Sequence, residues 1–213
     1  MKNNFSIAQC LFNEKHHSPE AIQSLLQQGE EDESAMIRLM PELVSMDTHP
    51  IRTAVRLAAD NDYDDELNIY TKYVELFIEK MDELTHTISV VEQSPVMTEE
   101  PLPSYAVSIR VNGDIDFVGG VIASEPVFLE MARRYSGEEL DQVDEMAVDC
   151  CKEFLNVVLG FFCIEMARRD LEGELHPPRW QKNVIPKGSR QLRLRTYTSF
   201  GSFQIVLAVD EFF

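Results

Sequence analysis

The sequence predicts an α+β fold, with a largely antiparallel sheet, long helices on one face of it, and a small helical extension at the N-terminus. Two observations favour this class. Segments in which apolar residues recur at helical spacing are separate from segments in which apolar and polar residues alternate. The alternating segments come as neighbouring pairs, at 105–117 and 192–209, which is typical of antiparallel hairpins. Hairpins with segregated helices indicate an α+β domain and not a parallel, doubly wound one.

The net charge of the chain argues against two classes of partner, nucleic acids and anionic membranes. The 213 residues include 37 acidic and 19 basic side chains, so the formal charge is −18. This charge would repel a nucleic-acid backbone or an anionic membrane surface, and we expect neither as a partner. The longest apolar run, 157–164, is too short to cross a membrane.

The expected compartment is the cytoplasm. The first residues, MKNNFSIAQCLFNEKHH, do not follow the pattern of a secretory signal. The four cysteines match neither a secreted disulfide framework nor a CxxC metal site, so we expect them to be reduced and mostly buried. A soluble, intracellular protein is therefore predicted.

Two parts of the chain are expected to differ in role. Residues 1–64 are predicted to be a helical N-terminal extension of unknown role, and 65–213 to be the main domain. The acidic stretch 60–66 indicates a linker or junction between them.

The extension is expected to consist of short helices. Ser18 followed by Pro19 is a typical helix start, with serine as the N-cap and proline at the first helical position. Further helices are predicted at 34–46 and 51–59 from their apolar spacing and their flanking turn residues.

The main domain is expected to open with a long amphipathic helix, 65–84, whose apolar residues recur at helical spacing. A strand at 87–91 follows. The segment 93–104 is expected to lack regular structure because it carries several prolines. Next comes a β-hairpin that turns at Asn112-Gly113, a dipeptide that favours tight hairpin turns.

Two helices and a final hairpin complete the predicted domain. Ser124 is expected to begin a short helix that ends near Tyr135, before Gly137. The longest helical pattern of the chain then runs from 138 to 171. Alternating apolar residues over 192–209 predict the closing hairpin.

The longest helix carries the candidate functional residues. At about 100° per residue, Asp149, Glu153, Asn156 and Gly160 fall on one stripe about 60° wide, and Lys152 borders it. The opposite side is apolar, so the stripe should face solvent. Glycine inside an exposed helix costs about 1 kcal/mol against alanine, which indicates close approach of a partner or a neighbouring element. Taken alone, this spacing also fits an ordinary solvated helix face.

The segment 149–160 resembles the helix motif of the CheC, CheX and FliY family of chemotaxis phosphatases. That motif has Asp or Ser, then Glu four residues on, Asn three further, and a small residue or proline after it, which Asp149, Glu153, Asn156 and Gly160 match. The preceding YSGEELDQVDEMAVD resembles the stretch that leads into this helix in CheX. The order of elements matches over roughly 66–213, and a single ExxN helix fits CheX better than CheC, which typically carries two.

The resemblance implies a chemistry. Proteins of this family remove the phosphoryl group from the aspartate of a CheY-like response regulator. By resemblance, Asn156 would hold a water for in-line attack, and Glu153 would pair with the receiver's active-site lysine. Asp149, Lys152 and Gly160 would contact the partner. The chain would bind no metal or cofactor of its own, because the partner receiver supplies the Mg²⁺.

Two other readings remain open at this stage. The chain could be a non-catalytic CheX-like module that binds a response regulator or a signalling complex without turnover. It could also be a structural homodimer in which the N-terminal helices supply the contact, and this reading can coexist with either of the others.

Overall fold

The computed structural model describes most of the chain. It divides the chain into two compact units: unit one is 1–95 with 194–202, and unit two is 96–193 with 203–213. The predicted boundary near 64 falls where residues 60–65 lie outside the described part, and it stays a prediction. The described residues are 4–14, 18–32, 34, 49–59, 66–96, 99–188 and 190–213.

The described residues contain one seven-stranded sheet with strand order β1-β6-β7-β3-β2-β4, and β5 also pairs with β2. The pairs β1–β6, β2–β3, β2–β4, β2–β5 and β3–β7 are all antiparallel, and the predicted α+β class is confirmed. The strands are β1 (Val90–Pro95), β2 (Ser104–Gly113), β3 (Phe117–Ser124), β4 (Gly173–Leu175), β5 (Arg179–Lys182), β6 (Gln191–Thr198) and β7 (Gly201–Ala208).

Unit one holds four described helices and strand β1. The helices are α1 (Asn4–Glu14), α2 (Pro19–Glu31), α4 (Pro50–Ala59) and α5 (Leu67–Thr85). The predicted N-cap is confirmed, because the Ser18 side chain accepts a hydrogen bond of 3.3 Å from the Ala21 amide. The helices expected at 51–59 and 65–84 correspond to α4 and α5. Apart from Ser34, the helix expected at 34–46 lies outside the described residues.

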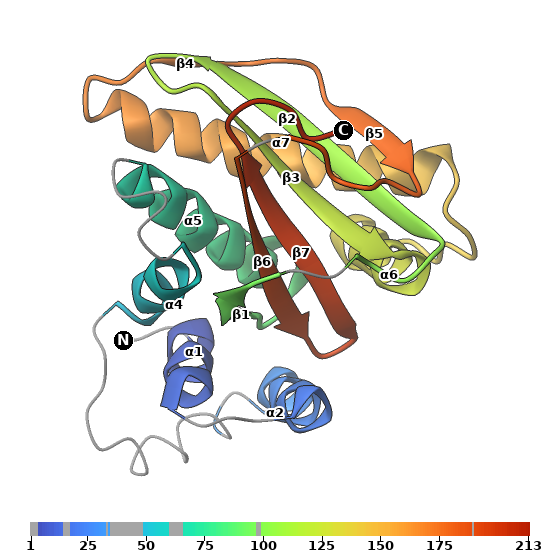
Figure 1. Ribbon diagram of the computed structural model, residues 1–213. Helices are drawn as coiled ribbons and strands as arrows, with labels where there is room; N and C mark the ends of the chain where they lie inside the picture. Colours follow the sequence, from blue (N-terminus) through green and yellow to red (C-terminus); the bar gives the residue numbers. More distant parts are fainter. Residues whose placement is uncertain are drawn as a thin grey trace. The chain divides into compact units, whose positions relative to one another are not determined.

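Helix α1 covers the outer edge of β1, beside which it lies in Figure 1. The fully buried Gln9 amide donates to the Val91 carbonyl oxygen and accepts from the Val91 amide, both at 2.8 Å. Since β1 ends the strand order, these backbone groups face no further strand, and the side chain takes its place. Asn13 Nδ2 also donates to the Pro50 carbonyl oxygen at 2.9 Å, which ties α1 to α4.

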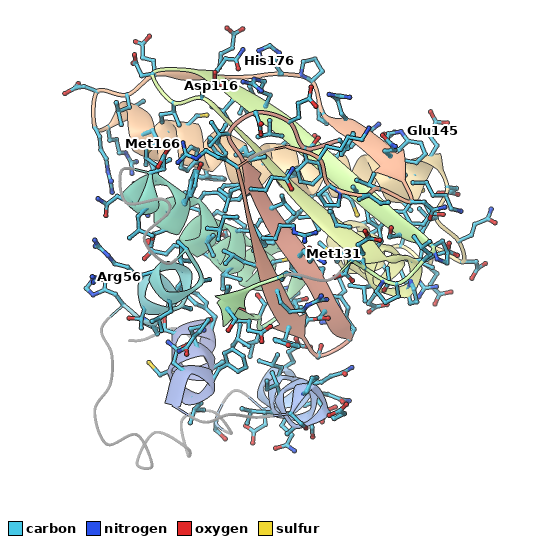
Figure 2. All side chains as sticks on the ribbon, viewed as in Figure 1. Arg56, Asp116, Met131, Glu145, Met166 and His176 are labelled. Carbon is cyan, nitrogen blue, oxygen red and sulfur yellow. The ribbon has the colours of Figure 1, made fainter. Side chains whose placement is uncertain are left out.

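Unit two places two helices on one face of β2 and β3 (Figure 1). They are α6 (Glu125–Ser136) and α7 (Glu145–Ala167). Aromatic pairs anchor them: the Tyr105 and Phe128 ring centroids lie 5.3 Å apart, and those of Phe117 and Phe162 lie 5.4 Å apart. Figure 2 labels Glu145 and Met166, which lie near the two ends of α7.

The opposite face of β2 and β3 is covered by the end of the chain. A Cβ atom on Gly120 would lie 2.6 Å from the Val107 carbonyl oxygen and 2.9 Å from the Phe212 ring. Only glycine therefore lets the Phe212 ring rest on the sheet at this point. The apolar cluster on this face consists of Ala106, Val118, Ile122, Val184, Val206, Ala208 and Phe212.

Some predicted element bounds are wrong. The hairpin does not turn at Asn112-Gly113: these two residues extend β2, because they pair with β4. The chain reverses instead at 114–116, between Gly113 at the end of β2 and Phe117 at the start of β3. The long helix begins at Glu145 and not at 138, since the Asp144 carboxylate caps it by accepting from the Ala147 amide at 3.1 Å.

The first strand, predicted at 87–91, begins and ends later in the structure. β1 covers Val90–Pro95, so it takes in the start of the segment expected to lack regular structure. It is irregular there, with a register shift between Val91 and Pro95 opposite β6. Strands β4 and β5 were not predicted. None of the helices within the described ranges is long and apolar enough to cross a membrane.

Candidate functional site

Helix α7 carries the candidate site, and its sequence fixes which side faces solvent. Apolar residues three and four apart make one continuous buried side, as the sequence predicted. Polar and small residues make the other side. The buried residues are Ala147, Val148, Cys151, Phe154, Leu155, Val158, Leu159, Phe162 and Met166.

The structure places the predicted site residues together on the accessible side of α7. Asp149 and Glu153 are exposed, and Lys152, Asn156 and Gly160 are partly exposed. Glu153 and Asn156 are three residues apart, so their side chains lie about one helical turn from each other on the same side. All five residues could therefore touch one docked partner.

Lys152 and Asp149 form an ion pair on this side. Lys152 Nζ donates to Asp149 Oδ1 at 2.9 Å, and the side chains are 25% and 61% exposed. A pair this exposed contributes little to stability, about 0–1 kcal/mol. Its consequence is positional, since it holds the ammonium group beside the Asp149 carboxylate.

Gly160 has no close neighbour among the described residues that would require a glycine. A Cβ atom added there would meet no described atom within 4 Å. Of the two reasons expected from the sequence, close approach of a neighbouring element is therefore not seen in the described part of the chain. The next residue, Phe161, is 44% exposed, and Ile164 is 52% exposed, so the accessible side becomes apolar beyond Gly160.

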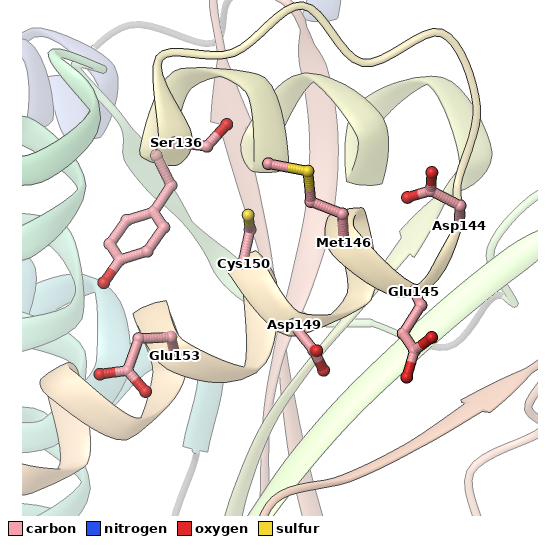
Figure 3. Close-up of a pocket in the computed structure, with 8 residues that line it drawn as sticks. Ser136, Asp144, Glu145, Met146, Asp149, Cys150 and Glu153 are labelled. Carbon is pink, nitrogen blue, oxygen red and sulfur yellow. The ribbon is translucent and has the colours of Figure 1, made fainter.

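An open groove lies between the end of α6 and the start of α7 (Figure 3). Its volume is about 740 Å³, and we refer to it as the α6–α7 groove. Figure 3 shows Met146 and Cys150 pointing towards α6, whereas Glu145 and Asp149 point to the other side of α7. The lining residues are Tyr135, Ser136, Asp144, Glu145, Met146, Asp149, Cys150 and Glu153.

Sequence reasoning missed most of this groove. The helical periodicity of α7 gives part of the signal, because Met146 lies four residues before Cys150 and therefore on the same side of the helix. In the structure the Met146 side chain is 47% exposed. Tyr135 and Ser136 come from a different helix. Their contribution becomes visible only when α6 packs against α7.

The groove disfavours ionisation of the Tyr135 phenol and the Cys150 thiol. Burial raises the pKa of Tyr135, and the nearby Glu153 carboxylate and Cys150 raise it further. Burial also raises the pKa of Cys150, with smaller contributions from Asp149 and Asp144 and an opposing hydrogen bond with Ser136. A thiol held neutral in this way is a poor nucleophile near neutral pH.

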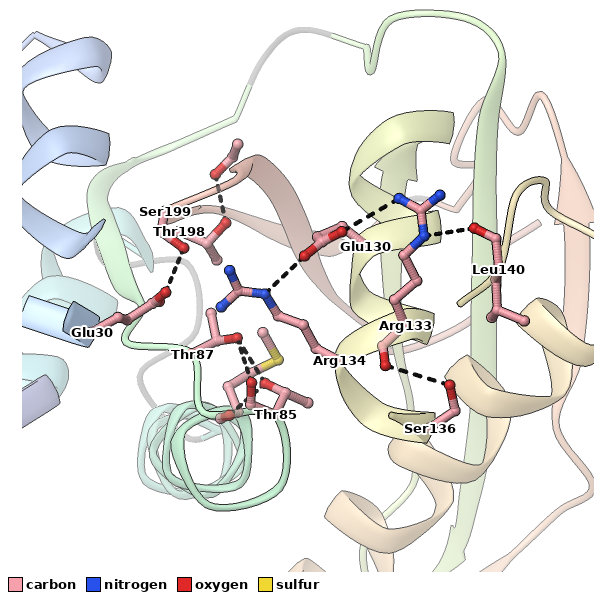
Figure 4. Close-up of polar contacts among 12 residues, drawn as sticks. Glu30, Thr85, Thr87, Glu130, Arg133, Arg134, Ser136, Leu140, Thr198 and Ser199 are labelled. Carbon is pink, nitrogen blue, oxygen red and sulfur yellow. Dashed lines mark hydrogen bonds and ion pairs between the residues drawn. The ribbon is translucent and has the colours of Figure 1, made fainter. Parts of the chain in front are cut away.

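The two arginines of α6, Arg133 and Arg134, are held by polar partners on α6 and in the loop that follows it (Figure 4). Arg133 Nε donates to the Leu140 carbonyl oxygen at 2.6 Å, and Arg133 Nη1 lies 3.5 Å from Glu130 Oε2. Arg134 Nε donates to Glu130 Oε1 at 3.1 Å. The carboxylate of Glu130 thus binds both guanidinium groups, and Arg133 fixes the loop between the helices.

Metal-ligating residues do not cluster in the part of the chain that the structure describes. No group of three or more His, Cys, Asp or Glu side chains there could hold a metal ion. The accessible side of α7 presents one amide, several carboxylates and one ammonium group. Such groups orient water, accept hydrogen bonds and bind cations.

Comparison with known proteins adds information about the fold. No protein-family model matches the sequence, and no curated protein matches it. Solved structures do match. The chemotaxis protein CheX from Desulfovibrio desulfuricans matches with 12% identity and a TM-score of 0.56, over 67% of this chain and 99% of that chain.

Two further solved structures have a similar fold. A chain of the CheX–CheY–BeF₃–Mg²⁺ complex from Borrelia burgdorferi matches with 15% identity and a TM-score of 0.53, over 65% of this chain and 94% of that chain. FliY from Thermotoga maritima matches with 12% identity and a TM-score of 0.52, over 71% of this chain and 92% of that chain. The chain therefore has the fold that CheX, CheC-like and FliY proteins share.

Proposed function

We propose that this protein is a phosphatase that removes the phosphoryl group from the aspartate of a CheY-like response regulator, in chemotaxis or related two-component signalling. The observation that carries the proposal is the placement of Glu153 and Asn156 about one turn apart on the accessible side of α7. The fold supports it, because CheX of Borrelia burgdorferi, which shares this fold, was solved in complex with CheY.

The proposed chemistry needs few groups. An aspartyl phosphate is already reactive, and phosphoryl transfer depends mainly on placing a nucleophile in line and stabilising charge. The Asn156 amide would orient a water molecule for this attack. The water oxygen forms a bond to phosphorus while the bond between phosphorus and the aspartate oxygen breaks. A neutral amide serves here by geometry and not as a base.

Glu153 would fix the position of the two proteins. Its carboxylate makes no ion pair among the described residues, so it is available to a lysine of the receiver. The Mg²⁺ ion that neutralises the phosphoryl oxygens would belong to the receiver, and no residue of this chain is assigned to it.

The neighbouring residues would bind the partner. Asp149 and Lys152 offer a paired carboxylate and ammonium group at the edge of the site. The open space over Gly160 leaves room for the backbone of the receiver to approach α7. We also propose a cytoplasmic location, and a homodimer stays a prediction that mass measurement in solution can test.

The test is a turnover assay. Each CheY-like receiver of the source genome is phosphorylated, and its phosphoryl lifetime is measured with this protein at one-hundredth of the receiver concentration. The proposal predicts a shortened lifetime with multiple turnovers. A stable complex with an unchanged lifetime would instead favour the non-catalytic module that binds the regulator.

A further inference from the structure

We propose that the α6–α7 groove is a second contact site for the same receiver, and that it binds a basic, amphipathic helix or loop of that partner. This inference rests on the part of the proposed function in which a receiver docks on α7. It adds a surface that sets affinity and partner choice, and this surface shares Asp149 and Glu153 with the proposed docking site.

Glu153 connects the groove to the proposed docking site of the receiver. This residue lines the groove and is also the proposed partner of the receiver lysine, so a docked receiver lies over one end of the groove. Glu145 lies about 12 Å further along the helix axis, at 1.5 Å per residue. A typical protein interface covers about 800 Å² on each partner, which is large enough to reach both ends.

The apolar part of the groove indicates one property of the occupant. Met146 is 47% exposed at the groove, next to the partly buried Cys150. An exposed methionine is flexible and packs against side chains of varied shape. The occupant should therefore present an apolar side chain to Met146.

The carboxylates of the groove indicate that the occupant is basic. Four carboxylates line the groove, from Asp144, Glu145, Asp149 and Glu153. Asp144 caps α7 and Asp149 holds Lys152, so within the described structure Glu153 and Glu145 are left for a partner. Glu145 offers its carboxylate from the outer rim of the groove, because its side chain points away from α6. Carboxylates along an open rim attract lysine or arginine and raise the association rate. A second copy of this chain has a formal charge of −18, so the predicted homodimer is not expected to form through this acidic groove.

The experiment measures binding and turnover separately. Each CheY-like receiver of the source genome, held active with beryllofluoride and Mg²⁺, is titrated with wild type, Met146→Gln, Glu145→Gln and Asn156→Ala. We expect Met146→Gln and Glu145→Gln each to weaken binding about threefold to tenfold. Glu145→Gln should also reduce the salt dependence of binding, because it removes one interfacial charge. Turnover at saturating concentration should stay at the wild-type level for both.

The control is Glu211→Gln, a change of the same kind at an exposed residue beside Phe212, on the other face of the sheet. It should bind like wild type, and equal unfolding midpoints show that each variant folds. Groove variants that bind like wild type while Asn156→Ala loses turnover would overturn the groove proposal and leave the proposed function intact.

The reverse outcome is equally distinct. Weakened binding in the groove variants, together with a wild type that shows no turnover, would retain the groove and remove the phosphatase assignment. If no receiver binds, or if the groove variants change only self-association, the groove does not serve a receiver and the proposal is overturned.

Discussion

The Gln9 side chain and the Val91 backbone, 82 residues apart in sequence, exchange two hydrogen bonds of 2.8 Å at the outer edge of β1. Helix α1 thereby completes the hydrogen bonding of an edge strand within unit one. An uncovered strand edge is a site for pairing with other chains, so this contact also protects the protein from aggregation.

Gln9→Ala should destabilise the protein by about 2–4 kcal/mol, because it leaves a buried amide and a buried carbonyl of Val91 without partners. The measurement is the free energy of unfolding in urea. Gln27→Ala is the matched control, since Gln27 is exposed and bonds only to Glu31 in the described structure. A Gln9→Ala effect no larger than the control effect would show that the edge contact carries no stability.

Gly120→Ala should also destabilise the protein, by about 1–3 kcal/mol. The added methyl group would lie 2.6 Å from the Val107 carbonyl oxygen and 2.9 Å from the Phe212 ring, so the sheet or the ring has to move. Thermal unfolding checks this. In a Phe212→Ala background, Gly120→Ala should cost less than in wild type but still destabilise the protein, because the contact with the Val107 carbonyl oxygen remains.

Gly160→Ala should have the opposite effect on stability. The methyl group meets no atom of the described residues within 4 Å, and alanine in a helix interior is favoured over glycine by about 1 kcal/mol. If the receiver approaches α7 at this point, turnover should nevertheless fall about tenfold or more, because a small misplacement of the reacting groups is costly. A stabilised variant with full turnover would remove Gly160 from the proposed interface.

Tyr197 gives a pH dependence of stability. Burial raises its pKa to about 12, and the charge of Glu92 and the hydrogen bond to it, 3.2 Å long, add to this effect. The folded state therefore holds the phenol proton more tightly than the unfolded state, whose tyrosine titrates near 10. This stability is fully present below pH 10 and is lost as the pH rises towards 12.

The check on this prediction is Tyr197→Phe, which cannot titrate. The difference in unfolding free energy between wild type and Tyr197→Phe should be constant from pH 7 to pH 9 and then shift against wild type from pH 10 to pH 12. A difference that stays constant to pH 12 would mean that the phenol titrates alike in both states.

Local sequence signals predicted the features that depend on neighbours in the chain. The Ser18 N-cap and the α6 helix between Ser124 and Gly137 were found because their signals lie within a few residues. The exposed stripe of α7 followed from helical periodicity. These signals are local, and they needed no knowledge of the sheet.

Features that depend on distant partners were missed. Asn112-Gly113 has the sequence of a tight turn, yet it continues β2 because β4 supplies hydrogen bonds from more than fifty residues further along the chain. β5 is exposed at all of its positions, so no alternation of apolar residues marks it. The α6–α7 groove and the Gln9 contact likewise require two elements that only the fold brings together.

The most direct test of the proposed function compares wild type with Asn156→Ala in the phosphoryl-lifetime assay, at receiver concentrations that saturate both. Asn156 is partly exposed and is not one of the buried residues of α7, so the variant should fold and bind the receiver. We predict that wild type shortens the lifetime with multiple turnovers and that Asn156→Ala loses this acceleration at least about a hundredfold while its affinity stays unchanged. Equal turnover by the two proteins would contradict the assignment of Asn156 as the residue that positions the attacking water.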